Sequence, residues 1–212
     1  MSEQLLDKRL NEFLNELASK APTPGGGSVA AVTGAMAAGL LVMVCDLTIG
    51  KKQYADFEAE AQAIRERAES LRLELQELAQ RDIDVFERLS SAYKLPRTTD
   101  ADSANRRAAI QTVTKQATEI PLQTGRAIAK LLVLCPALAQ SGSRLVVSDV
   151  GVAAALIQSA VPAALLNVEI NLVSLEDTLF VQETRAHMKD LTMGINEEVA
   201  DVLKIVGERI AN

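Results

Sequence analysis

The stretch from Lys52 to Ala92 constrains the fold more than any other part of the sequence, because neither proline nor glycine interrupts it. Apolar residues recur there at alternating steps of four and three, the heptad spacing of a helix that packs against other helices. This seam consists of Phe57, Ala61, Ile64, Ala68, Leu71, Leu75, Leu78, Asp82, Val85 and Leu89. A continuous helix over the range is about 60 Å long. The sequence therefore predicts a protein organised around one long helix.

Helical periodicity continues through the rest of the chain, whereas strand signals are weak because the apolar runs are long and rich in Ala and Leu. The further helices are expected at 2–19, 29–49, 100–139, 148–174 and 175–211, with a kink or break at Pro121, an end near Pro136 and a break at Pro162. No repeat or linker divides them. We expect a single all-α domain over 1–212, an up-and-down bundle of long helices around buried Ala/Gly-rich helices.

Residues 29–49 are long and apolar enough to span a bilayer. The run is nevertheless rich in Ala and Gly, contains Asp46 and lacks flanking aromatic residues. It therefore predicts a central helix buried on all sides, and no membrane partner. Two nearly uncharged helices and a helix of about 60 Å are hard to enclose in one chain of 212 residues, which favours a homodimer.

Composition argues against several functional classes. The net charge of −6 disfavours a nucleic-acid partner. Cys45 and Cys135 lie in apolar runs and indicate buried free thiols in a reducing compartment. The charged N-terminus lacks the apolar segment of a signal peptide, so we expect a cytoplasmic protein. A metal site is not expected, since there is no CxxC or HExxH motif and the one histidine, His187, lies in a charged surface stretch.

Asp82 is the one residue of the heptad seam that does not suit a core. A carboxylate in an apolar seam costs several kcal/mol unless it is paired, hydrogen-bonded or neutralised. Such a group often has a raised pKa and serves as a catalytic acid or base. The alternative is a polar residue that sets the register of the helix, or a seam that has turned outward at this point.

Glycines precede the apolar run, in the segment Gly25, Gly26, Gly27 and Ser28. Free backbone N–H groups at a helix start bind carboxylates or polar ring edges, although the glycines alternatively serve a tight turn beside another helix. At the other end of the run, Lys51 and Lys52 either bind an anion or cap the helix dipole.

Two further polar pairs lie in apolar surroundings. Ser148 and Asp149 open a helix, where they are candidates for a site or simply the helix cap. Asn167 and Asn171 share one helix face, where buried amides need partners, either a ligand or a neighbouring helix.

Together these segments resemble one family, the formiminotransferase-cyclodeaminase C-terminal domain family. The resemblance is carried, in order, by PTPGGGSVAA at 22–31, LTIGKKQY at 47–54, DIDVF at 82–86, YKLPR at 93–97, SDVGVAA at 148–154 and ALLNVEINL at 164–172. PTPGGGS is the most specific of them. One departure is Gly142-Ser143, where members often have Gly-Asn before the Ser-Asp motif.

The resemblance implies a homodimeric all-helical enzyme that acts on a tetrahydrofolate derivative without a metal or redox cofactor. It implies formimidoyltetrahydrofolate cyclodeaminase activity, or alternatively methenyltetrahydrofolate cyclohydrolase activity. The candidate catalytic carboxylate is Asp82, with Asp149 second.

The candidate substrate-binding groups are Gly25, Gly26, Gly27 and Ser28 for the pterin or the reacting end, Lys51 and Lys52 for the glutamate tail, Ser148, and Asn167 for the pterin. A rival from another class is a non-catalytic helical module that binds folate or scaffolds a partner.

Overall fold

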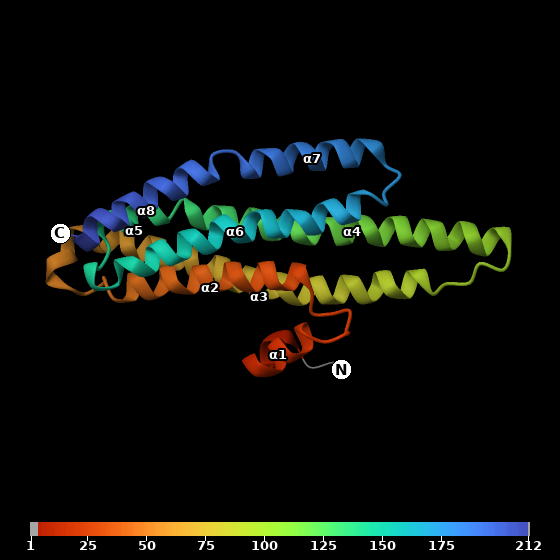
Figure 1. The fold of residues 1–212 in the computed structure, drawn as a ribbon, viewed down its shortest axis with the longest axis horizontal. Helices are drawn as coiled ribbons and strands as arrows, with labels where there is room; N and C mark the ends of the chain where they lie inside the picture. Colours follow the sequence, from red (N-terminus) through yellow and green to blue (C-terminus); the bar gives the residue numbers. More distant parts are fainter. Residues whose placement is uncertain (1–3, 212) are drawn as a thin grey trace.

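The computed structural model describes residues 4–211, and within them every regular element is a helix. The long helices lie side by side in an elongated bundle (Figure 1). The elements are η1 (Leu5–Asp7), α1 (Leu10–Leu17), α2 (Gly26–Asp46), η2 (Lys52–Phe57), α3 (Glu58–Tyr93), α4 (Asp100–Leu132), α5 (Cys135–Ser141), η3 (Arg144–Val146), α6 (Val147–Leu172), α7 (Thr178–Thr192) and α8 (Ile195–Ala211). The expected all-α bundle is confirmed.

The heptad seam lies on α3 and faces the core as expected. Ala61, Ala68 and Leu75 are fully buried, and α3 packs mainly against α2 and α4. The α-helix begins at Glu58 rather than at Lys52, because the preceding residues form a short 3-10 helix with Tyr54 outside the helical region at φ −119° and ψ 19°.

Neither internal proline breaks its helix, contrary to expectation at Pro162. Helix α4 continues through Pro121 and α6 continues through Pro162. Proline cannot donate to the carbonyl four residues before it. For Pro121 that carbonyl belongs to Ala117, and it accepts a hydrogen bond of 2.8 Å from the Asn171 side chain of α6 instead. The neighbouring helix thus satisfies the acceptor that the proline leaves unpaired.

The C-terminal segment 175–211 forms two helices, not one as expected. Helix α7 ends at Thr192 and α8 starts at Ile195. Gly194 between them has φ +82°, a left-handed conformation that glycine adopts without strain. The helix is therefore interrupted at this glycine.

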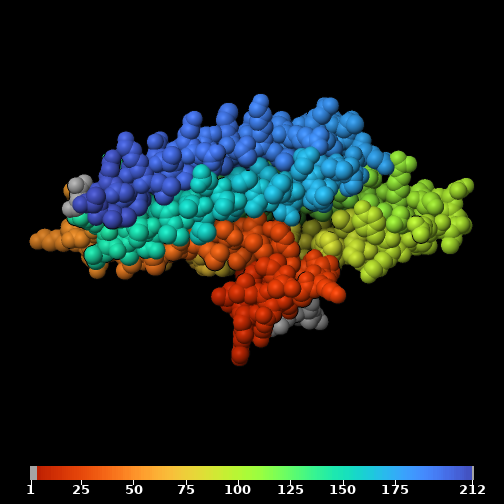
Figure 2. Space-filling view, in the orientation of Figure 1, coloured from red at the N-terminus to blue at the C-terminus, as the bar shows by residue number. Residues whose placement is uncertain are grey.

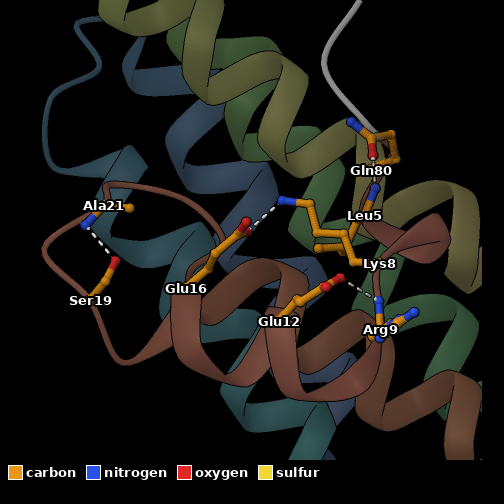
Figure 3. A network of polar contacts seen from close by, with 8 residues as sticks. All are labelled: Leu5, Lys8, Arg9, Glu12, Glu16, Ser19, Ala21 and Gln80. Carbon is orange, nitrogen blue, oxygen red and sulfur yellow. Dashed lines mark hydrogen bonds and ion pairs between the residues drawn. The ribbon is translucent and has the colours of Figure 1, made fainter.

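The N-terminal residues form an arm beside the bundle, where Figure 1 shows α1 lying apart from the long helices. The helix expected over 2–19 is divided into η1 and α1, and residues 2 and 3 lie outside the described part. Leu5 is buried, and its N–H donates to Oε1 of Gln80 on α3 at 2.8 Å (Figure 3). No residue of α1 itself is buried, so Leu5 anchors an otherwise exposed arm.

Helix α2 forms over nearly the expected residues, but it is not buried on all sides. Its inner side is tightly packed, because a Cβ at Gly34 would lie 2.5 Å from Cγ1 of Ile128. On its outer side Met36 and Met43 are 52% and 37% exposed. The neighbours α3, α6 and α4 cover the inner side of α2 and leave its outer side open.

Three described helical segments are apolar and long enough, judged by length and composition alone, to cross a membrane: Gly26–Asp46, Asp100–Ser141 and Arg144–Leu172. The two cysteines are free and buried as expected, and burial raises the pKa of both thiols to about 12. His187 is exposed, also as expected.

Candidate active site

A cavity of about 300 Å³ lies where α2 begins. Four segments that are distant in the sequence meet there: the N-terminal loop and first turn of α2, the second half of α3, the middle of α4 and the end of α6. Its lining residues are Pro22, Thr23, Gly25, Gly26, Gly27, Asp82, Val85, Phe86, Leu89, Ala117, Asn167, Ile170 and Asn171. We call this cavity the Asp82 pocket, because it brings that carboxylate, the glycines and Asn167 together.

The Asp82 side chain projects from α3 toward the first turn of α2. The hydroxyl of Ser28 donates to Oδ2 of Asp82 at 2.9 Å. Burial raises the pKa of Asp82 above its ordinary value, and hydrogen bonds from the Ser28 side chain and backbone partly oppose that rise. The pocket therefore holds a half-buried carboxyl group with fixed donors, and no cation contributes to the shift.

Gly27 allows this close approach between α2 and α3. A Cβ at Gly27 would lie 2.2 Å from Oδ1 and 2.6 Å from Cγ of Asp82. No side chain fits at that distance, so any other residue would displace the carboxyl group. Gly27 is therefore needed for close helix packing, which was one of the two interpretations of the glycine segment. The group against which it packs is the candidate catalytic carboxyl group.

Ser28 does not itself line the pocket. It is fully buried and lies behind the carboxyl group that it hydrogen-bonds. Its position supports Asp82 and leaves Gly25 and Gly26, which do line the pocket, to face a ligand.

Asn167 supplies a second polar group on the opposite wall. Its Oδ1 lies 3.2 Å from where a Cβ of Gly26 would be, and its Nδ2 donates to the carbonyl of Ala163 at 2.9 Å. Its remaining hydrogen-bonding capacity is available to a ligand. Asn171, one turn further along, is occupied by its bond to the α4 backbone and bridges two helices.

Phe86 is a pocket residue to which the sequence reading gave no role. It lies one helical turn after Asp82 on the same face of α3, and it is 40% exposed. Its spacing from Asp82 is the signal that could have identified it. With Val85, Leu89 and Ile170 it forms an apolar wall suited to a flat aromatic ring.

Lys51 and Lys52 are not in the Asp82 pocket. They line a wider groove of about 960 Å³ at the far end of α2, together with Gln53, Tyr54 and Ser143. Helix α2 has 21 residues, so about 31 Å separates its two ends. Both lysines are exposed. We call this groove the Lys51 groove.

The walls of the Lys51 groove are fixed by two long-range hydrogen bonds. The backbone N–H of Ser143 donates to Oγ1 of Thr48 at 2.8 Å, and that of Arg144 donates to the hydroxyl of Tyr54 at 3.0 Å. The second bond lowers the pKa of Tyr54. Ser143, the position of the family departure, therefore lies far from Asp82.

Ser148 and Asp149 also lie away from Asp82. They occupy the first turn of α6, whose start lies near the end of α2 because the two helices run in opposite directions (Figure 1). One subunit therefore does not bring Asp82 and Asp149 together. Within residues 4–211, no three side chains among His, Cys, Asp and Glu are grouped so as to hold a metal ion.

Comparisons with known proteins agree on one family. The family model described as formiminotransferase-cyclodeaminase matches residues 9–190. A methenyltetrahydrofolate cyclohydrolase from Methylorubrum extorquens is 38% identical, over 93% of this chain and 97% of its own. The formimidoyltransferase-cyclodeaminase of Sus scrofa is 34% identical over 95% of this chain, which spans only 37% of that protein.

A solved structure resembles the whole fold. The formiminotetrahydrofolate cyclodeaminase of Thermotoga maritima superposes with a TM-score of 0.85 at 31% identity, covering 97% of this chain and 98% of that one. The Methylorubrum cyclohydrolase and the Thermotoga cyclodeaminase are thus each matched over nearly their whole length.

Proposed function

Because the chain belongs to the formiminotransferase-cyclodeaminase family, we propose that it is an enzyme of one-carbon tetrahydrofolate metabolism that reacts its substrate in the Asp82 pocket. The observation that carries the proposal is the half-buried carboxyl group of Asp82, held by Ser28 in a pocket with an apolar wall and the side-chain amide of Asn167. The substrate carbon in question lies between N5 and N10 of tetrahydrofolate.

The first candidate reaction is the cyclodeaminase reaction. N10 attacks the formimidoyl carbon on N5, a new C–N10 bond forms, and the carbon becomes tetrahedral. Asp82 takes the proton from N10 and returns it to the formimidoyl nitrogen, which takes a further proton from solvent and leaves as ammonia. The product, 5,10-methenyl-tetrahydrofolate, carries a positive charge next to the carboxylate, which stabilises it.

A second candidate is the cyclohydrolase reaction, favoured by the 38% identical relative of matching length. Water adds to the methenyl carbon and Asp82 takes one of its protons. The carbon–N5 bond then breaks as Asp82 passes that proton to N5, and the remaining hydroxyl proton is lost to solvent to leave 10-formyl-tetrahydrofolate. One proton is released overall. Both reactions pass through a tetrahedral carbon between the same two nitrogens, so one carboxyl group serves either.

The other pocket groups fit recognition of the pterin. Phe86 offers a partly exposed ring for stacking, and Asn167 with the Gly26 backbone offers polar contacts to the ring edge. The exposed lysines of the Lys51 groove suit the anionic glutamate tail.

We also propose a homodimer in the cytoplasm. The half-exposed apolar helices α2 and α6 support the dimer. Two free buried cysteines are typical of a reducing compartment.

The test is absorbance of 5,10-methenyl-tetrahydrofolate after mixing the protein with 5-formimidoyl-tetrahydrofolate or, separately, with methenyl-tetrahydrofolate. Appearance in the first mixture identifies a cyclodeaminase. Faster loss in the second, with a flat first trace, identifies a cyclohydrolase. If a folded protein changes neither trace relative to the uncatalysed control, the proposed enzyme activity is wrong and the protein is better described as a non-catalytic helical module.

A further inference from the structure

The outer side of α2 carries a partly exposed stripe with the spacing of a helix–helix contact. Its residues recur at alternating steps of three and four and consist of Val29, Val32, Met36, Gly39, Met43 and Asp46. None of them is buried. Heptad spacing is the pattern by which a helix packs lengthwise on another helix, and this stripe has no such neighbour within the subunit.

Helix α6 carries a second stripe of the same kind. Its members are all exposed and consist of Ser148, Val152, Ala155, Ser159, Pro162, Leu166, Ile170 and Val173. Leu166 and Ile170 are 73% and 70% exposed. Helices α2 and α6 pack against each other, and Figure 2 shows both on the face turned to the viewer, in orange and blue-green. We call this surface the α2/α6 face.

The α2/α6 face joins the two sites. Ile170, at one end, also lines the Asp82 pocket, and Leu47, which directly follows Asp46 at the other end, lines the Lys51 groove. About 31 Å of helix separates the two sites within a subunit. A pterin with its aminobenzoyl group and one glutamate is only about as long as five extended residues, roughly 17 Å. One subunit therefore cannot hold the reacting carbon at Asp82 and the first glutamate at Lys51.

We propose that a second copy of the chain packs antiparallel on the α2/α6 face, so that each Asp82 pocket is completed by the Lys51 groove of the partner subunit. A two-fold axis through the middle of α2 places the end of one α2 beside the start of the other. Gly39 lies midway between Gly26 and Lys51. A Cβ there would meet nothing nearer than Cδ of Arg72 at 3.9 Å, which leaves room for the partner's backbone.

The proposed two-fold axis also moves Ser148 and Asp149 next to an Asp82 pocket. They lie at the end of α6 that adjoins the Lys51 groove, and the two-fold axis carries them to the partner's Asp82 pocket. The segments that carry the family resemblance are split between two distant places in one subunit. In the antiparallel dimer they meet at each of two shared sites. This inference rests on the proposed function, because the bound tail is what the lysines hold.

A second copy fits this face better than a lipid surface does. The face is two helices wide and about 31 Å long, roughly 600 Å² in projection, close to the roughly 800 Å² per partner of a stable interface. Its stripes include the charged Asp46, which pairs with Arg65, and the exposed Ser148 and Ser159. Such groups, and a chain without tryptophan, are poorly suited to hydrocarbon.

The shared site is tested by co-expressing two differently tagged variants, Asp82→Asn and Lys51→Glu/Lys52→Glu, and purifying the heterodimer through both tags. Each variant alone is expected to lose activity when a polyglutamylated substrate is supplied at a low substrate concentration. In the heterodimer one of the two shared sites is intact, so about half of the wild-type activity returns. Activity no higher than the mean of the two parents would place both groups in one subunit and overturn the inference, while loss in Asp82→Asn alone still supports the proposed function.

The interface is tested independently of activity by sedimentation of Met36→Glu, with Met193→Glu as the matched control. Met193 is also exposed but lies between α7 and α8, away from the α2/α6 face. The wild type and Met193→Glu are expected to be dimers and Met36→Glu a monomer. A monomeric wild type, a Met36→Glu dimer, or a wild type that floats with anionic liposomes through Met36 would each overturn the proposal.

Discussion

The two ends of helix α2 differ in how far the charged side chains beside them are buried. At its start, Asp82 is half-buried, held by Ser28 and pressed against Gly27 in a cavity of about 300 Å³. At its end, Lys51 and Lys52 are exposed in a groove of about 960 Å³. A proton-transferring carboxyl group needs desolvation and fixed donors, because these set its pKa. Lysines that hold an anionic tail work while hydrated, so they need no such enclosure.

The largest expected effect is that of Asp82→Asn. Removing a general acid–base group lowers kcat/KM by about 10²- to 10⁴-fold. The control is Asp84→Asn, since Asp84 is exposed on the other side of α3 and hydrogen-bonds only Gln80 among the bonds seen. Both are measured with the absorbance assay. A fully active Asp82→Asn protein would remove the proposed mechanism.

The same variant is expected to be at least as stable as the wild type at neutral pH. The folded state raises the pKa of Asp82, so it binds this proton more tightly than the unfolded chain does. Stability from this group is present at low pH and is lost as pH rises through the folded pKa. Asparagine keeps an acceptor for Ser28 and has no charge to bury. Thermal unfolding at neutral and acidic pH checks this, and a large loss of Tm at neutral pH contradicts it.

Gly27→Ala tests the close packing at the start of α2. Because a Cβ would lie 2.2 Å from Oδ1 of Asp82, the carboxyl group must move, and a displacement of about 1 Å costs on the order of 10²-fold in rate. Gly207→Ala on α8 is the control, since a Cβ there meets nothing within 4 Å. Equal activity of the two variants would show that the position of the carboxyl group is unimportant.

A smaller effect, whose direction can be predicted, is expected in the pH dependence of kcat/KM. Because burial raises the pKa of Asp82, the acid limb of kcat/KM is expected above the usual range of an aspartate. The hydroxyl of Ser28 opposes that rise, so Ser28→Ala moves the limb to still higher pH. Rates are measured over roughly pH 4 to 9. A limb that stays in place or moves down in Ser28→Ala would show that Asp82 is not the titrating group.

The smallest expected effect is at the open end of α2. Lys51→Ala/Lys52→Ala is expected to raise KM for a polyglutamylated substrate by about tenfold, the effect of losing one charged hydrogen bond, with little change in kcat. Lys204→Ala, an exposed lysine on α8, is the control. A fall in kcat with unchanged KM would assign the lysines to the chemical step. The two ends of α2 would then not differ as a catalytic end and a tail-binding end.

The sequence was sufficient to predict the helical class and the anomaly at Asp82, because heptad spacing reports which side of a helix faces the core. It could not show that Gly27 touches Asp82, since the two are 55 residues apart and only the packing of α2 on α3 brings them together. The role of Asn171 was equally hidden, because it depends on the carbonyl that Pro121 leaves unpaired on another helix.

The placement of Lys51 and Lys52 was beyond local patterns for a related reason. A sequence shows that lysines follow an apolar helix, but their distance from Asp82 depends on the direction of that helix in the fold and, in the proposed dimer, on the arrangement of the two subunits. The break between α7 and α8 was different, because Gly194 was a visible signal that an otherwise amphipathic pattern obscured.

The most direct test is a crystal structure of the protein with 5,10-methenyl-tetrahydrofolate or a stable 5-formyl analogue bound. We predict that the one-carbon group lies within hydrogen-bond reach of Asp82, about 2.6–3.2 Å or through one water, with the pterin against Phe86 and the tail directed to the partner subunit. A pterin seated in the Lys51 groove, away from Asp82, would contradict it.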